Sequence, residues 1–155
     1  MLVNKKQKPI NIMFGMGVSS AKIYDELYLL IRKALDCGIF AFDTAPSYKT
    51  EAVLGACLKK CMPELAMKRE DLFIQTKIDA WQMTEGERKV ESYIESVIQE
   101  MGVEYLDAVC IHWPIPEYMK QTWNAFIRIR EKGLVRKLGI CNLRMRQLKQ
   151  LPISE

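Results

Sequence analysis

Four short apolar runs of the sequence each lead into a polar residue, and these polar residues recur at a nearly constant interval. Asp43, Lys77, His112 and Asn142 follow the runs, and they lie 34, 35 and 30 residues apart. About 30 residues is the length of one strand–helix–strand unit with its loops. The recurrence therefore predicts parallel strands joined by helices, with a polar residue near the carboxyl end of each strand.

The expected elements alternate between strand and helix. We expect strands at 14–18, 39–42, 72–76, 108–111 and 138–140. We expect helices at 24–35, 51–61, 87–101 and 118–131, with a further helix beginning near Met145. The strands are continuous apolar runs, which indicates burial on both faces. The pattern predicts an α/β fold built from right-handed βαβ units.

Length and composition narrow the class of protein. The 155 residues suit one domain over 1–155, and 49% hydrophobic with 27% charged residues is typical of a folded globular chain. The net charge of +4 is spread along the chain, which argues against nucleic-acid binding. No apolar run approaches the roughly 20 residues of a membrane span, and no signal peptide or metal-ligand set is visible. Five cysteines, an odd number, favour reduced thiols and a cytoplasmic location.

The predicted rim of polar residues has a specific chemistry. Tyr48 follows Asp43 by five residues, and a phenol is a weak acid at neutral pH. A buried Lys77 ammonium would favour the phenolate, and Asp43 would supply the carboxylate that a buried lysine needs. His112 would add a neutral donor that orients a carbonyl oxygen. Such a group suits protonation of an oxygen that gains charge during hydride transfer.

Two other interpretations compete with this one. Asp43 and Lys77 could form a purely structural ion pair, since such pairs are common in folded proteins. A Rossmann-type dehydrogenase is disfavoured, because no G-x-G-x-x-G segment follows a strand.

Several segments in order resemble the aldo-keto reductase family. Residues 38–48 resemble its signature G-x-x-x-x-D-T-A-x-x-Y, and residues 51–55 resemble E-x-x-[LV]-G. Residues 73–77 resemble the strand that ends in the family's lysine. Residues 105–114 resemble its Y-[LI]-D…H-W-P stretch, and residues 133–143 resemble its G-x-[IV]-[RK]…G-[IV]-S-N-F stretch. The resemblance implies NAD(P)H-dependent reduction of an aldehyde or ketone to an alcohol, with NADPH or NADH as the cofactor.

The resemblance also implies roles for single residues. The implied catalytic group is Asp43, Tyr48, Lys77 and His112, with Tyr48 as the general acid. The implied cofactor-binding residues are Asp43, Cys141 and Asn142, and Trp113 would line the substrate pocket. Cys141 stands where the family usually has serine, so one cofactor hydrogen bond is expected to be weaker.

The chain is short for this family. A (β/α)8 TIM barrel needs about 250 residues, and about five βα units are visible here. The expected fold is therefore α/β, a partial barrel whose open edges call for self-association or a partner chain. Two functional classes stay open. One is a carbonyl reductase, which could be inactive as the isolated truncated chain. The other is a non-catalytic binding or regulatory subunit, or an inactive remnant.

Overall fold

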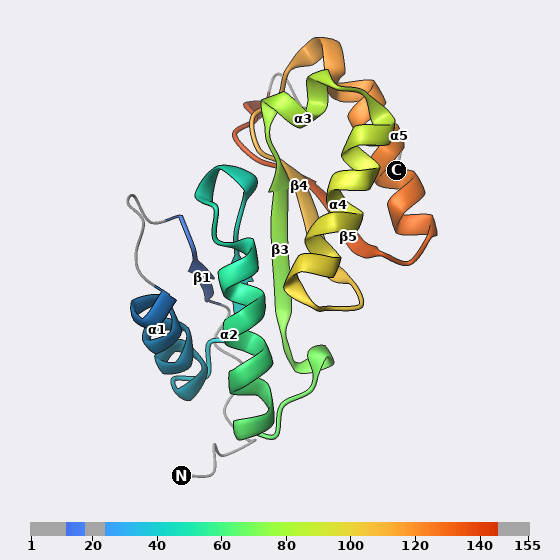
Figure 1. The fold of residues 1–155 in the computed structure, drawn as a ribbon. Helices are drawn as coiled ribbons and strands as arrows, with labels where there is room; N and C mark the ends of the chain where they lie inside the picture. Colours follow the sequence, from blue (N-terminus) through green and yellow to red (C-terminus); the bar gives the residue numbers. More distant parts are fainter. Residues whose placement is uncertain (1–11, 18–23, 146–155) are drawn as a thin grey trace.

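A computed structural model of the protein describes residues 12–17 and 24–145, which form one parallel sheet with helices packed against it (Figure 1). The strands follow one another in the sheet in sequence order, and each neighbouring pair is parallel. They are Met13–Gly15 (β1), Ala41–Asp43 (β2), Phe73–Ile78 (β3), Leu106–Ile111 (β4) and Val135–Ile140 (β5). The α/β class and the parallel sheet expected from the spacing are confirmed.

Helices connect the strands. The α-helices are Tyr24–Asp36 (α1), Glu51–Glu64 (α2), Ala80–Thr84 (α3), Glu87–Met101 (α4) and Pro116–Glu131 (α5). Two short 3-10 helices are Pro46–Tyr48 (η1) and Arg69–Asp71 (η2). The described residues end at Met145, which is helical, and the rest of the helix expected there lies outside them. Within the described part of the chain, the helices are too short or too polar to cross a membrane.

Some boundaries differ from the predicted ones. We expected α2 to end before Pro63, but the helix includes it. A proline in the last turn removes only one backbone hydrogen bond, to the carbonyl of Lys59, and water can replace the donor because Lys59 is exposed. β1 ends earlier than the predicted strand at 14–18, since β2, its partner among the described strands, ends at Asp43; Val18 lies outside the described residues. The short helix α3 was not predicted at all.

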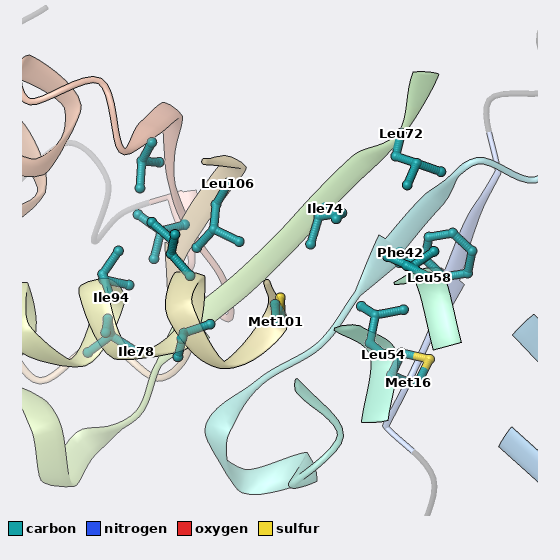
Figure 2. Packing of buried hydrophobic residues seen from close by; sticks show 14 of the residues in the cluster. Met16, Phe42, Leu54, Leu58, Leu72, Ile74, Ile78, Ile94, Met101 and Leu106 are labelled. Atoms are coloured by element: carbon teal, nitrogen blue, oxygen red, sulfur yellow. The ribbon is translucent and has the colours of Figure 1, made fainter. Parts of the chain in front are cut away.

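The hydrophobic core lies between the sheet and the helices (Figure 2). Phe42, Ile74 and Ile78 project from the strands, and they are fully buried against residues such as Leu54 of α2 and Ile94 of α4. Because successive strand residues point to opposite faces, the residues between these side chains face away from the helices. That second face carries Asp43, Gln75 and Lys77, so the pleat brings the polar residues of β2 and β3 together.

The face of the sheet that points away from the helices, here called the inward face, is open at the amino ends of the strands. A cavity of about 520 Å³ lies there, and Met13, Ala41 and Phe73 contribute to its lining. This cavity is at the opposite end of the strands from Asp43, Lys77 and His112. It is therefore separate from the predicted rim of polar residues.

α2 and α4 approach each other closely at Gly55. A Cβ atom at Gly55 would lie 2.4 Å from the Cα atom of Met101 and 2.5 Å from its carbonyl oxygen. We expect Gly55→Ala to lower the free energy of unfolding by about 1–3 kcal/mol, because the helices must separate. Urea denaturation measures this change. Gly15→Ala is the matched control, since a Cβ there meets no atom within 4 Å. Equal losses in both variants would contradict the close packing.

Candidate active site

A buried ion pair joins β2 to β3 at the rim. Lys77 is 4% exposed, and its Nζ atom lies 2.7 Å from each carboxylate oxygen of Asp43. The ammonium also donates to the carbonyl oxygen of Thr44 at 2.9 Å. Gln75 donates from Nε2 to Oδ1 of Asp43 at 2.8 Å. Asp43 is thus engaged with protein donors through both of its oxygens.

The loop that carries Tyr48 is closed by a pair of hydroxyl groups. Oγ1 of Thr44 and Oγ1 of Thr50 lie 2.8 Å apart, and both side chains are buried. Between them, η1 directs Tyr48 toward Lys77, whose Nζ atom lies 4.7 Å from the centre of the phenol ring. The ring packs on the backbone of Gly17, where an added Cβ would lie 3.1 Å from Cζ. The loop therefore holds the phenol against the ammonium.

A buried carboxyl group anchors the start of α2, directly after this loop. Glu51 accepts hydrogen bonds from the hydroxyls of Thr76, the residue before Lys77, and of Tyr93 in α4. Burial raises the pKa of the Glu51 carboxyl, and burial beside Glu51 raises the pKa of Tyr93. The network ties the Tyr48 loop to β3 and to α4.

His112 lies on the other side of the Tyr48 hydroxyl. Its Nε2 atom is 3.4 Å from the phenolic oxygen, and the two rings meet edge to face. Nδ1 lies 2.5 Å from Oδ1 of Asp79. Trp113 stacks on the imidazole with ring centres 5.7 Å apart, and it is 57% exposed at the rim. The predicted catalytic residues are thus brought together, and Trp113 lies beside them. Their catalytic roles stay predictions.

Asn142 and Cys141 follow β5 at the same rim. Asn142 adopts a left-handed backbone with φ of 54°, which asparagine tolerates better than most residues. Its Nδ2 atom donates to the carbonyl oxygen of His112 at 2.8 Å. The backbone N–H of Cys141 donates to the carbonyl oxygen of Ile111 at 2.7 Å. Two of the three residues predicted to bind cofactor, Cys141 and Asn142, therefore lie next to His112.

The side chain of Cys141 is unusually acidic for a thiol. A hydrogen bond with the thiol of Cys110 lowers the pKa of Cys141 to about 7, and it raises the pKa of Cys110. The ordinary cysteine pKa is about 8.5. The thiolate of Cys141 is therefore the major form above about pH 7 and the minor form below it.

We expect alkylation of Cys141 by iodoacetamide to follow this ionisation. Its rate should rise with pH and reach half of its plateau near pH 7, because the thiolate is the nucleophile. Peptide mass spectrometry separates Cys141 from the exposed Cys37. In Cys110→Ala the midpoint should move up toward about 8.5. An unchanged midpoint in that variant would contradict the role of Cys110.

Comparison with known proteins identifies the family. The model of the aldo/keto reductase family matches residues 11–154. The chain belongs to the aldo/keto reductase family. Members of this family use NAD(P)H, which agrees with the cofactor expected from the sequence. The resemblance inferred from the motifs is thereby confirmed.

Individual aldo/keto reductases match the chain over part of their length. Methylglyoxal reductase DkgA of Escherichia coli O157:H7 is 33% identical over 145 residues, which are 91% of this chain and 50% of the relative. Glyoxal reductase of Bacillus subtilis is 30% identical over 138 residues, which are 89% of this chain and 48% of the relative. The chain spans about half the length of the curated relatives it matches.

Solved structures of aldo/keto reductases show the same arrangement. A Brucella melitensis member has a TM-score of 0.73 at 29% identity, covering 88% of this chain and 51% of that one. A Bombyx mori member in complex with NADP has a TM-score of 0.79 at 23% identity, covering 99% and 55%, and this likeness shows the fold alone. Such neighbours are (β/α)8 barrels, so the predicted partial barrel is confirmed.

Three contributors to the site were missed in the sequence. Asp79 contacts His112, Gln75 supports Asp43, and the Thr44–Thr50 pair closes the Tyr48 loop. Only Asp79 had a readable signal, because Asp79 and Gln82 have the D-x-x-Q spacing of a helix start. The contact of Gln75 depends on strand register, and the contact between the two threonines depends on how the loop closes, so neither has a signal in the sequence.

Proposed function

We propose that this chain carries the proton-donating half of an NAD(P)H-dependent carbonyl reductase. The position of the Tyr48 hydroxyl is the observation that supports this proposal most strongly. The Tyr48 hydroxyl lies 3.4 Å from Nε2 of His112, while the buried Lys77 ammonium lies 4.7 Å from the phenol ring. A phenol between a cation and an imidazole is suited to give its proton to a substrate oxygen. A purely structural ion pair would need neither the tyrosine nor the histidine.

Each residue has a distinct task in this proposal. A nicotinamide held at this rim would supply a hydride for the carbonyl carbon. Tyr48 donates its proton to the oxygen as negative charge develops there. Lys77 stabilises the phenolate that remains, and Asp43 keeps the buried ammonium paired at 2.7 Å. His112 and the exposed ring of Trp113 position the substrate at the rim.

The residues present fit part of a nicotinamide site. Asn142 already donates from its amide nitrogen to His112, which directs its oxygen to accept from a carboxamide N–H. Cys141 adds a sulfur at the same edge. The chain spans about half the length of its relative methylglyoxal reductase DkgA, and we propose that further cofactor contacts come from polypeptide that corresponds to the other half.

A second polypeptide surface completes the barrel in this proposal. β1 and β5 are the edges of the five-stranded sheet, and the inward face holds the open cavity that Met13 and Phe73 line. Edge strands have unpaired backbone groups, and apolar residues on the inward face would otherwise meet water, so both favour contact with a second protein surface. We propose a second copy of the chain or the remaining barrel half in this place. We propose a reducing compartment such as the cytoplasm for a chain with five cysteines.

The substrate class follows from the relatives. Two of them are named methylglyoxal reductase and glyoxal reductase, whose names denote small dicarbonyl compounds. We propose a small aldehyde or ketone of this kind for the present chain. The second candidate function is a non-catalytic reductase-like subunit or an inactive remnant, and the half-length match is the observation that favours it.

NADPH titration separates the two candidates. Three tryptophans report binding by fluorescence, and Trp113 lies beside the predicted site. We expect saturable quenching by NADPH in the form of the chain that sediments as a dimer or larger assembly. Asn142→Ala should weaken binding, whereas Tyr48→Phe should leave it intact. The absence of saturable binding by a folded chain would overturn the reductase proposal and favour the non-catalytic one.

A further inference from the structure

Asp79 lies beside His112 at the ends of two neighbouring strands. The register pairs Ile78 of β3 with Ile111 of β4, so the next residues, Asp79 and His112, meet above the sheet. Both are buried, with exposed fractions of 3% and 7%. Oδ1 of Asp79 is 2.5 Å from Nδ1 of His112. The two side chains therefore interact in surroundings with little water.

Two further hydrogen bonds hold Asp79 in place, one to its carboxylate and one from its backbone. Its Oδ2 atom accepts the backbone N–H of Ser47, next to Tyr48, at 2.9 Å. Its own backbone N–H donates to Oε1 of Gln82 at 2.9 Å, which fixes the start of α3 directly beyond β3 (Figure 1). The side chain of Asp79 thus connects the Tyr48 loop to the imidazole, and its backbone N–H connects the same residue to α3.

This contact fixes where the histidine carries its proton. A carboxylate has acceptors only, so a lone pair on Nδ1 at 2.5 Å would face another lone pair. The proton must therefore lie between Oδ1 and Nδ1. A neutral imidazole then presents a lone pair at Nε2, toward the Tyr48 hydroxyl at 3.4 Å. That is the opposite of the neutral donor expected from the sequence.

We propose that Asp79 is a positioning residue that holds His112 in the tautomer with the proton on Nδ1. Nε2 then accepts from Tyr48 when the ring is neutral, and it donates to a substrate oxygen only when the ring carries both protons. The Asp79 carboxylate is the countercharge for that imidazolium. The polar rim thus contains two balanced pairs, Asp43 with Lys77 and Asp79 with His112. The tautomer stands on its own, and its use in catalysis rests on the proposed function.

Nitrogen NMR of labelled histidine tests the tautomer directly. His112 is the only histidine, so a chain labelled with ¹⁵N-histidine gives one pair of ring nitrogens. In the unaltered chain at neutral pH without cofactor, we expect the proton on Nδ1 and a downfield-shifted proton resonance on that nitrogen. Observation of the neutral ring with its proton on Nε2 would overturn the proposal, and this measurement needs no variant.

Asp79→Asn adds a test by substitution. Asparagine keeps an oxygen for the Ser47 N–H, but its amide N–H₂ faces Nδ1 and requires a lone pair there. We expect the proton to move to Nε2, so that the two nitrogen shifts exchange their character. Asp71→Asn is the matched control, because Asp71 accepts a backbone N–H from Lys68 on the surface. An unchanged tautomer in folded Asp79→Asn would overturn the proposal. A failed NADPH titration would overturn only the proposed function.

Discussion

Replacing Tyr48 with phenylalanine is expected to lower the rate of carbonyl reduction by about 10²–10⁴-fold, the usual contribution of a general acid. The substitution removes the one proton that the site can place beside both Lys77 and Nε2 of His112. The aromatic ring itself stays, so its packing on Gly17 is preserved. The oxidation of NADPH with methylglyoxal as substrate, followed by absorbance, measures the loss.

The Tyr48→Phe experiment has an internal control. NADPH binding should persist in the variant, because the hydroxyl is not among the groups predicted to hold the cofactor. Tyr93→Phe removes a phenolic hydroxyl that bonds Glu51 and lies away from His112, so it should affect stability more than turnover. Equal activity in Tyr48→Phe and the unaltered protein would exclude Tyr48 as the general acid.

Replacing Asp43 with alanine is expected to lower the free energy of unfolding by about 3–5 kcal/mol, the usual cost of removing one partner from a buried ion pair. Lys77 is 4% exposed, and it would retain only the carbonyl oxygen of Thr44 as a polar partner among its described contacts. Burying an unpaired ammonium is costly because water no longer solvates it. Urea denaturation of the folded chain measures the change.

A double variant separates the charge from the loss of side-chain atoms. Asp43→Ala combined with Lys77→Met removes both charges, so no unpaired ammonium remains in the core. We expect the double variant to regain part of the stability that Asp43→Ala loses, since replacing a whole buried pair by apolar groups is often neutral. A double variant less stable than Asp43→Ala would show that the ion pair is not the source of the loss.

The strand-end residues explain why so much of the site could be predicted. Parallel strands end at the same edge of a sheet, so the intervals between Asp43, Lys77 and His112 already implied one cluster. The continuous apolar runs before them identified the strands. Element boundaries were less accurate at places such as Pro63, because a proline in the last turn of a helix costs only one backbone hydrogen bond and need not end the helix.

The sequence by itself determined the succession of strands and helices along the chain, the α/β class and the presence of a polar rim, because these depend on hydrophobic pattern and spacing. Only the tertiary structure decided which polar residues of the rim form hydrogen bonds with one another. Asp79 contacts His112, and Gln75 contacts Asp43, and in each pair the two residues lie more than 30 positions apart in the sequence. Such contacts depend on the register of the sheet and on side-chain rotamers. The pattern of residue types along the chain predicts neither of them.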